Sequence, residues 1–257
     1  MEIRFAKVDL QNIRDLNEAY ISSLSSPIES YLEGHILKSE HFSILVDGNP
    51  VGFFSTFNKD LLTRFFLKVD HRRMSQEVFF QVKKSQCVSA AFVPTCDEFF
   101  LSHALDDHKS IDKQAYFFKD TKILMDDTKR DNQIFLRLAG LPDAEQIVKY
   151  SHDFFDDLEK SLLQETIYIA TKDGQIVGFG IMEKGIIMEH YVSIGMFTIE
   201  SSRQQGVGKN ILRLLKDIVY KNGLVPIAGC WYYNHNSKKT LEGAGMYSDT
   251  RLLKLNF

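Results

Sequence analysis

In residues 47–53 the chain reads Asp47-Gly48-Asn49-Pro50-Val51-Gly52-Phe53, and in residues 173–179 it reads Asp173-Gly174-Gln175-Ile176-Val177-Gly178-Phe179. Each copy lies between two runs rich in β-branched and aromatic residues. Asp-Gly between such runs is a strong signal of a β-hairpin, because a type I′ turn needs positive φ at both central residues. Single hairpins are common, but a shared Val-Gly-Phe in each half of a 257-residue chain indicates a duplicated domain.

The elements that flank the two hairpins follow the same order in each half. The first half is predicted to contain helix 10–24, the hairpin, strand 64–68, helix 75–83, strand 88–93, helix 98–107 and strand 114–118. The second half is predicted to contain strand 136–138, a helix that opens at Pro142, the hairpin, strand 192–198, helix 208–221, strand 225–232, helix 237–242 and strand 252–255. The polar stretch 126–133 is the predicted linker. We therefore expect two α/β domains of similar plan, residues 1–130 and 131–257.

Composition limits both the size and the partners of the protein. With 31 Lys+Arg against 34 Asp+Glu the net charge is −3, and 44% of the residues are hydrophobic. At a prior of about 150 residues per domain, the length allows one large domain or two moderate ones. No basic block supports binding to nucleic acid, and no apolar run approaches the ~20 residues needed to cross a membrane. Residues 1–7 alternate apolar and charged side chains, which is not the pattern of a signal peptide.

The three cysteines, Cys87, Cys96 and Cys230, are odd in number and widely spaced. They predict free buried thiols in a reducing compartment and no disulfide frame. No metal site is expected, because His103 and His108 lack the H-E-x-x-H spacing and no C-x-x-C pair occurs. We expect a cytoplasmic protein without a metal.

The strongest chemical signal lies in residues 198–209. They read Thr198-Ile199-Glu200-Ser201-Ser202-Arg203-Gln204-Gln205-Gly206-Val207-Gly208-Lys209. A strand ends here, a polar turn follows, and two glycines stand at the mouth of an amphipathic helix. Glycines allow the backbone to approach a ligand closely and the helix dipole favours negative charge, which predicts a cradle for a phosphate or pyrophosphate. The alternative is a strand-to-helix turn that uses glycine for geometry alone.

Two named phosphate motifs do not fit this segment. A Walker A loop, G-x-x-x-x-G-K-S/T, would have Arg203 at its first glycine and Asn210 at its hydroxyl position. A dinucleotide fingerprint, G-x-G-x-x-G, would have Glu183 or Ile211 at its third glycine. The pattern that fits is R-x-x-G-x-G, formed by Arg203, Gly206 and Gly208.

R-x-x-G-x-G between such a strand and helix resembles the acetyl-CoA pyrophosphate loop of the GNAT N-acetyltransferase superfamily. The resemblance extends downstream to Asn234, Ser237 and Gly245, which are similar to the superfamily's closing N-x-x-A/S and G-F/M patterns. It extends upstream to the Asp-Gly hairpin and covers essentially all of 131–257. It implies two tandem GNAT-like domains of the α/β (α+β) class, each with a mixed, mostly antiparallel central sheet flanked by helices.

The resemblance also implies how acetyl-CoA is held. The splayed end of the fourth strand, 196–198, would pair through its backbone with the pantetheine amides. Residues 204–209 would offer N–H groups to the pyrophosphate, with Arg203 as a charged donor. Asn234 would reach the pantetheine arm or the thioester and Ser237 would hydrogen-bond the cofactor, the alternatives being a turn-capping Asn and a helix N-cap Ser. The implied cofactor-binding residues are Met196, Phe197, Thr198, Arg203, Gln204, Gln205, Gly206, Val207, Gly208, Lys209, Asn234 and Ser237.

Fewer residues point to the catalytic groups. The superfamily mechanism is direct attack of an amine on the acetyl thioester, which needs a base for the ammonium and an acid for the leaving thiolate. Many members of the superfamily have a tyrosine acid seven residues after the Asn of the closing pattern. In this chain that Asn is Asn234, and the position seven residues later holds Leu241. Tyr232 or Tyr233 could replace it, or both could be strand or pocket-wall aromatics. Glu189 is the predicted catalytic base, with His190 beside it, although a lone Glu is more often a surface carboxylate.

The first half lacks the cradle. Its corresponding segment, Arg72-Arg73-Met74-Ser75-Gln76-Glu77-Val78, has no glycine and carries a negative charge at Glu77. If Cys96 is aligned with Cys230, then Phe100 and His103 take the places of the Asn and the Ser. We therefore interpret 1–130 as a degenerate domain without a cofactor site, which completes the substrate cleft or acts as a built-in dimer partner.

The resulting hypothesis is an N-acetyltransferase that moves an acetyl group from acetyl-CoA to a primary amine of a small molecule by direct attack. The alternative is a CoA-binding regulatory or interaction protein with little catalytic activity, which Leu241 at the acid position favours. Neither hypothesis involves nucleic acid, a membrane or a metal. We expect a monomer or homodimer with acetyl-CoA as its co-substrate.

Overall fold

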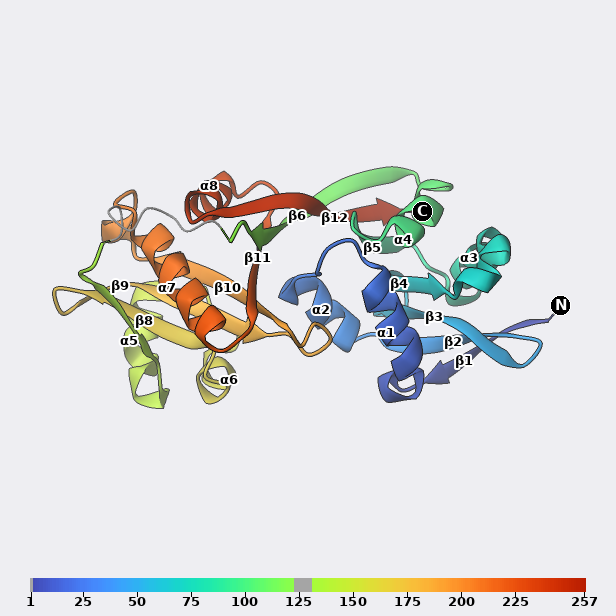
Figure 1. The fold of residues 1–257 in the computed structure, drawn as a ribbon, viewed down its shortest axis with the longest axis horizontal. Helices are drawn as coiled ribbons and strands as arrows, with labels where there is room; N and C mark the ends of the chain where they lie inside the picture. The colour runs from blue at the N-terminus through green and yellow to red at the C-terminus, as the bar shows by residue number, and fades with distance from the viewer. Residues whose placement is uncertain (1, 123–130) are drawn as a thin grey trace. The chain divides into compact units, whose positions relative to one another are not determined.

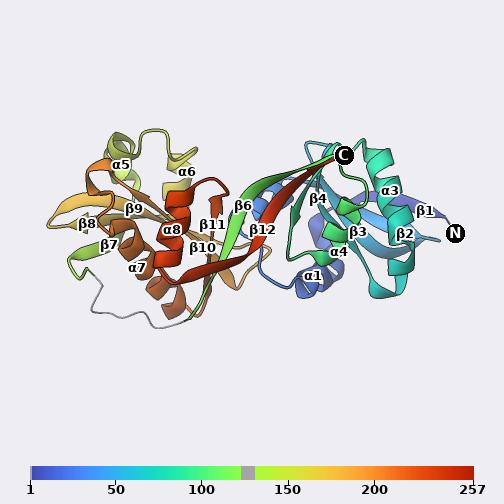
Figure 2. The ribbon, with the colours of Figure 1, turned by 90° about the horizontal axis from the view of Figure 1, so that it is seen from above.

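The computed structural model describes residues 2–122 and 131–257, which form two compact units (Figure 1, Figure 2). The first unit comprises Met1–Phe117, Trp231–Tyr233 and Asp249–Phe257, and the second comprises Phe118–Cys230 and Asn234–Ser248. Most of the predicted linker, residues 126–130, lies outside the described residues. Within the described ranges, every helix is too short or too polar to span a membrane.

The first unit is a mostly antiparallel sheet flanked by helices. Its strands are β1 (Ile3–Val8), β2 (Glu40–Val46), β3 (Asn49–Phe57), β4 (Leu61–Leu67), β5 (Ala90–Pro94) and most of β6 (Ser110–Asp120). Its helices are α1 (Arg14–Ser23), α2 (Ser30–Leu37), α3 (Ser75–Gln86) and α4 (Glu98–Leu105), with the 3-10 helices η1 (Leu10–Ile13) and η2 (Val69–Met74). Neighbouring strands are antiparallel from β1 to β4, whereas β4 and β5 are parallel. The core contains the fully buried Phe65, Val78 and Phe100, which bring β4, α3 and α4 together.

The second unit repeats this plan. Its strands are β7 (Ile134–Leu138), β8 (Ile167–Lys172), β9 (Gln175–Lys184), β10 (Tyr191–Thr198) and most of β11 (Val225–Trp231). Its helices are α5 (Ala144–Ser151), α6 (Leu158–Leu163), α7 (Val207–Lys221) and α8 (His235–Gly243), with the 3-10 helices η4 (Leu141–Asp143) and η5 (Glu200–Ser202). The strands follow the order β7-β8-β9-β10-β11 and are antiparallel except for the parallel pair β10 and β11. The predicted class, with mixed and mostly antiparallel sheets flanked by helices, is confirmed.

The last strand, β12 (Met246–Asn256), joins the sheet of the first unit. Residues 252–256 pair antiparallel with 90–94 of β5, and Thr95 N donates to Arg251 O at 2.8 Å. A strand's partner is set by hydrogen bonds to residues distant in the chain, so the internal repeat did not reveal this pairing. The compact units therefore do not coincide with a division between residues 130 and 131.

Both predicted hairpins form, and they share their details. The turn residues 47–48 have φ of 48° and 84°, and the turn residues 173–174 have φ of 51° and 75°. The ladder of each hairpin then shifts register by one residue, which leaves Val51 and Val177 as the extra residue of a β-bulge. The same bulge after the same turn supports the duplication.

The glycine of each Val-Gly-Phe has a packing role. A Cβ on Gly52 would lie 2.1 Å from Phe66 O, and a Cβ on Gly178 would lie 2.4 Å from Phe197 O. Each of these oxygens belongs to the backbone of the next strand, β4 or β10, and cannot move aside without disturbing the sheet. Glycine at this point allows neighbouring strands to pack closely in both units.

Some local features differ from the sequence-based expectations. The helices α2 and α6 were not expected. The three cysteines are free, but Cys87, which ends α3 in a left-handed conformation with φ of 51°, is exposed. Cys230 is half-buried, whereas Cys96 is buried and its burial raises the pKa of its thiol to about 12. The expectation of three buried thiols is therefore correct for Cys96 and wrong for Cys87.

A buried ion pair ties α7 to the first residues of the second unit. Lys216 Nζ lies 2.6 Å from Asp120 Oδ1 and donates to Ala244 O at 3.0 Å. Tyr220 OH donates to Asp120 Oδ2 at 2.6 Å, and burial followed by this hydrogen bond raises the pKa of Tyr220. The Lys216 and Asp120 side chains are only 9% and 2% exposed. Loss of one partner would leave the other charge buried and unpaired.

We expect Lys216→Met to lower the free energy of unfolding of the second unit by about 3–5 kcal/mol, because Asp120 would lose its cation while remaining buried. Lys172→Met is the matched control, since its partner Asp131 is 28% exposed and such pairs contribute about 0–1 kcal/mol. Scanning calorimetry of both variants measures the difference. Equal destabilisation by the two substitutions would contradict a structural role for the buried pair.

Candidate functional site

Strands β10 and β11 part in the middle of their length. In the described residues, their parallel register covers three pairs and ends at Ser193↔Ile227. On its other side β10 continues to pair with β9 as far as Thr198. On the side that faces residues 228–230, residues 194–198 therefore have no strand partner among the described residues, although Thr198 O accepts a hydrogen bond from Arg203, and we call the opening between these two segments the V.

Side chains at the end of β10 alternate between two faces. Met196 and Thr198 lie against the first turn of α7, since their Sδ and Oγ1 atoms stand 3.1 and 3.0 Å from the position of a Cβ on Gly208. Phe197 points to the opposite face, where its ring centroid lies 4.8 Å from that of Phe154. The side chains of this segment are thus engaged in packing, and its backbone edge is what the V offers to a ligand.

The turn after β10 contains two residues in the left-handed backbone conformation, which residues other than glycine rarely adopt. Gln204 and Gly206 have φ of 61° and 79°. A Cβ on Gly206 would have one neighbour within 4 Å, Asn210 Nδ2 at 3.9 Å, so glycine is needed here for its conformation and not for space. Asn210 donates from its backbone N–H and from its side-chain amide to Gly206 O, both at 3.1 Å, which fixes the turn to the helix. Because Val207 begins α7, its N–H and the next one have no acceptor within the helix.

Gly208 allows the first turn of α7 to approach the end of β10 closely. A Cβ there would lie 3.0 Å from Thr198 Oγ1, 3.1 Å from Met196 Sδ and 3.3 Å from Thr240 Cγ2. The first turn of α7 therefore lies directly on the end of β10 and beside α8. Close packing of α7 on β10 requires glycine at position 208 whether or not a ligand binds. The same packing places the N–H groups of Val207 and Gly208 at the mouth of the V.

Arg203 forms a hydrogen bond with the last residue of β10. Its Nε donates to Thr198 O at 3.3 Å. In the first unit Arg72 makes the corresponding bond, in which its Nε donates to Leu67 O at 3.4 Å. Since this contact also occurs in the unit that lacks the glycines, it belongs to the shared fold. The side chain of Arg203 is nevertheless exposed on the turn, where its charge can act on an anion.

Asn234 and Ser237 are joined at the start of α8. Asn234 Oδ1 accepts a hydrogen bond from Ser237 N at 3.0 Å, so Asn234 is the N-cap of α8. The capping interpretation of Asn234 is confirmed, and the interpretation of Ser237 as the cap is wrong, because Ser237 lies inside the helix. Both residues follow β11, and Asn234 is exposed.

The structure does not bring the predicted base to the turn. Glu189 and His190 are exposed and precede β10 at the end where it pairs with β11, whereas the turn follows the other end of β10. Glu183, which the sequence analysis did not single out, pairs across from Ser193 at the closed end of the V and is also exposed. Only strand register identifies it, and register is not readable from one sequence. Leu241 is 3% exposed, so its side chain belongs to the core.

Both tyrosines considered as acids, Tyr232 and Tyr233, belong to the first unit. Tyr232 stacks on Tyr116 with centroids 4.7 Å apart, and Lys113 Nζ lies 4.9 Å from the Tyr232 ring. A hydrogen bond with Tyr116, followed by one with Lys113, lowers the pKa of Tyr232. Tyr233 is 53% exposed. Among the described residues, no three His, Cys, Asp or Glu side chains gather into a group that could hold a metal ion.

In the first unit, the residues that correspond to the cradle carry side chains that make contacts of their own. Ser75 begins α3, and its hydroxyl lies 2.7 Å from His103 Nε2. The guanidinium of Arg72 lies 4.4 Å from the centroid of the Phe99 ring. Residues 69–75 are all described, and none of them has a positive φ. The first unit therefore lacks the left-handed turn that the second unit has.

The helix caps also correct the internal alignment. Asp97 Oδ1 accepts from Phe100 N at 3.0 Å and caps α4, as Asn234 caps α8. Asp97 is thus the counterpart of Asn234. The alignment on Cys96, which put Phe100 in that place, is wrong because the cap and not the cysteine marks the equivalent position.

Comparison with known families gives matches in both halves of the chain. Residues 9–121 match the model described as Acetyltransferase (GNAT) domain, and residues 134–246 match the model described as Acetyltransferase (GNAT) family. Each match contains one copy of the bulged hairpin. A search of the curated proteins finds no significant match.

Solved structures of similar fold extend over the whole chain. One is an acetyltransferase of the GNAT family from Colwellia psychrerythraea, with 21% identity, coverage of 100% of both chains and a TM-score of 0.85. Another is a GCN5-related N-acetyltransferase from Sphaerobacter thermophilus, with 12% identity, coverage of 99% of this chain and 95% of that chain, and a TM-score of 0.69. A third is a tandem GNAT protein from the clavulanic acid biosynthesis pathway, with 11% identity, coverage of 100% and 98%, and a TM-score of 0.62. At these identities the likeness concerns the fold.

We expect Asn234→Ala to destabilise the second unit by about 1 kcal/mol, because Ser237 N would lose its acceptor. Asn234→Asp keeps an oxygen in the same place and serves as the control, with stability close to that of the parent chain. Thermal unfolding of both variants measures the effect. An alanine variant as stable as the aspartate variant would show that the cap contributes nothing.

Proposed function

The chain belongs to the GNAT acetyltransferase family and is an acyltransferase with two tandem domains, and from this premise we propose that it moves the acetyl group of acetyl-CoA to a primary amine of a small molecule. We place the reaction in the second unit. The observation that supports this choice is the V, whose open backbone edge ends at a left-handed turn and at the N-terminus of α7.

The residues of the second unit fit acetyl-CoA as a co-substrate. An extended chain that carries amides can add to the unpaired edge at 194–198, as a further strand would. A pyrophosphate needs N–H donors and positive potential, which the start of α7 at Val207 and Gly208 supplies. Arg203 on the turn and Lys209 in the first turn of α7 add positive charge. Acetyl-CoA bound here would supply an activated acetyl thioester.

The acceptor amine must lose a proton before it attacks. We propose Glu189 as the base, as the sequence suggested, and Glu183 as the competing candidate. Both carboxylates are exposed near the closed end of the V, at the opposite end of β10 from the turn. An extended arm that starts at the turn and follows the edge of β10 would direct its far end toward them. Leu241 can provide no acid, because its side chain is apolar and buried.

A second candidate function is CoA binding with little catalysis. The observation that favours it is the same buried Leu241, which leaves the usual acid position without a titratable group. The two functions share the cradle and differ in turnover, so one assay separates them.

We also propose that the first unit binds no CoA. Its strands β4 and β5 pair in parallel over two positions, as β10 and β11 do over three. The start of its α3, however, has no left-handed turn, and the corresponding residues Ser75 and Arg72 contact His103 and Phe99. One CoA per chain is the expected stoichiometry.

We expect Gly206→Val to weaken CoA binding at least about tenfold, because a β-branched residue does not readily adopt a φ of +79° and the turn must change shape. Gly223→Val is the matched control: its φ is +71°, its Cβ would also enter open space, and it follows the other end of α7. Isothermal titration of the full chain with CoA measures affinity and stoichiometry. Unchanged affinity in Gly206→Val, or two CoA per chain, would refute the cradle assignment.

We expect the parent chain to release free thiol from acetyl-CoA when it is supplied with an amine from a broad panel, and we expect Glu189→Gln to lower kcat about 10²-fold or more. The loss should shrink at high pH, where solvent deprotonates the amine. Glu183→Gln is the parallel variant, and the same pattern there would move the base to Glu183. CoA binding without thiol release for any amine would favour the second candidate function.

A further inference from the structure

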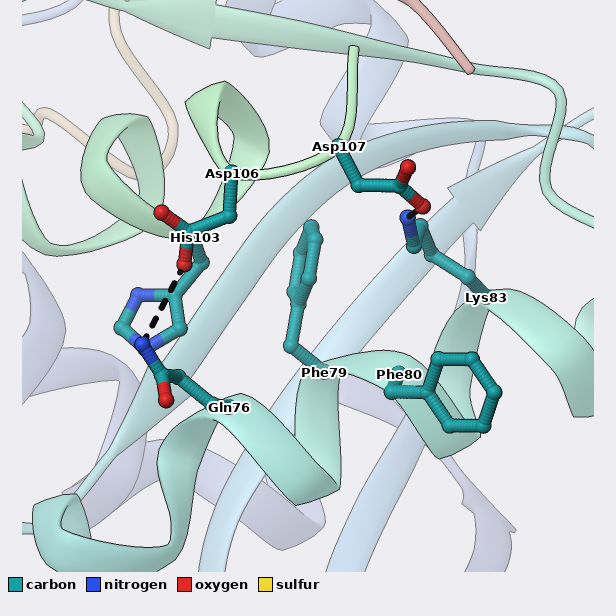
Figure 3. A pocket seen from close by; sticks show the side chains of 7 residues that line it. All are labelled: Gln76, Phe79, Phe80, Lys83, His103, Asp106 and Asp107. Atoms are coloured by element: carbon teal, nitrogen blue, oxygen red, sulfur yellow. Dashed lines mark hydrogen bonds and ion pairs between the residues drawn. The ribbon is translucent and has the colours of Figure 1, made fainter.

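A hollow of about 490 Å³ lies between α3 and α4 of the first unit (Figure 3). All of its lining residues belong to the first unit, and the reaction proposed above makes no use of it. The lining residues are Gln76, Phe79, Phe80, Lys83, His103, Asp106 and Asp107.

The floor of the hollow is aromatic and offers few polar donors. Phe79 is buried and stands between the Gln76–Asp106 contact and the Lys83–Asp107 pair, whereas Phe80 is 56% exposed (Figure 3). His103 contributes ring carbon only, since its Nδ1 bonds to Phe99 O and its Nε2 to Ser75 Oγ, both at 2.7 Å. Ring faces of this kind attract cations and apolar groups.

The charges around this floor are mainly negative. Asp106 Oδ2 accepts a long hydrogen bond from Gln76 Nε2 at 3.4 Å, and Asp107 Oδ2 lies 2.5 Å from Lys83 Nζ. Each carboxylate keeps its second oxygen outside these contacts. The hydrogen bond from Lys83 lowers the pKa of Asp107, so this carboxyl is ionised at neutral pH. Both aspartates follow α4 directly, where the carbonyl end of the helix also favours positive charge.

Among the described residues that line the hollow, Lys83 is the cation, and it is already engaged, while Lys109 acts on Asp107 from outside the lining. The Lys83 side chain is 11% exposed, and its Nζ lies 4.5 Å from the centroid of Phe257 and 5.7 Å from that of Phe79 in addition to its contact with Asp107. An anionic ligand would have to displace Asp107 while facing Asp106. A cationic ligand meets two carboxylates and an aromatic surface, so charge complementarity selects the cation.

We infer that this hollow binds a small organic ammonium ion, with its charged head at Asp106 and Asp107 and its apolar carbon chain on Phe79 and Phe80. The inference rests on residues of the first unit alone and does not depend on the proposed function. Lys83 acts as an internal competitor, because a bound ammonium shares Asp107 with it.

The test uses the full chain, isotope-labelled for NMR, and three probes of similar size: n-butylammonium, 1-butanol and butyrate. We expect n-butylammonium to shift the backbone signals of 76–83 and 103–107 in a saturable way, and the other two probes to leave them nearly unchanged. Asp106→Asn should weaken the binding about fivefold or more, while Asp15→Asn, an exposed aspartate on α1, should have no effect.

Lys83→Met gives the sharpest outcome. Methionine retains the packing of the long side chain but frees Asp107, so the affinity for n-butylammonium should rise about twofold or more. Weaker n-butylammonium binding in Lys83→Met, stronger binding of butyrate than of n-butylammonium to the parent chain, or equal shifts with 1-butanol would each overturn the inference.

Discussion

The contact between the first turn of α7 and the end of β10 determines the geometry of the second unit's site. Gly208 makes it possible, because any side chain there would meet Thr198 and Met196 at 3.0–3.1 Å. Because the first turn of α7 packs on the end of β10, two features of the second unit lie at the same place. One is the unpaired edge of β10, and the other is the set of N–H groups that no α-helix satisfies at its own start. The chemistry proposed for the V requires both.

The first unit shows the same fold without the two glycines and without the left-handed turn. It keeps the bulged hairpin, the parallel strand pair and the arginine that braces the strand end. It has Ser75 at the start of α3, and the hydroxyl of that residue contacts His103. The segment that carries the two glycines in the second unit thus carries side chains with partners in the first. The two units share one scaffold, and small local changes give them different surfaces.

Local turn chemistry explains which parts of the fold could be predicted from the sequence. Asp-Gly at 47–48 and 173–174 needs no distant partner to specify its turn, and the hairpins form as predicted. The partner of β12 could not be predicted, because strand pairing depends on residues far apart in the chain. The cap formed by Asn234 was one of the interpretations that the sequence offered, and the hydrogen bond from Ser237 N confirms it. Glu183 was missed because its position depends on register, which a single sequence does not contain.

The most direct measurement of the central claim is a crystal structure of the full chain with CoA. The account predicts pyrophosphate oxygens at hydrogen-bond distance, about 3 Å, from the backbone N atoms of Gly206 to Gly208, and a pantetheine arm along residues 194–198 of β10. It also predicts no CoA in the first unit. CoA bound away from the V, or bound between α3 and β4 of the first unit, would contradict it.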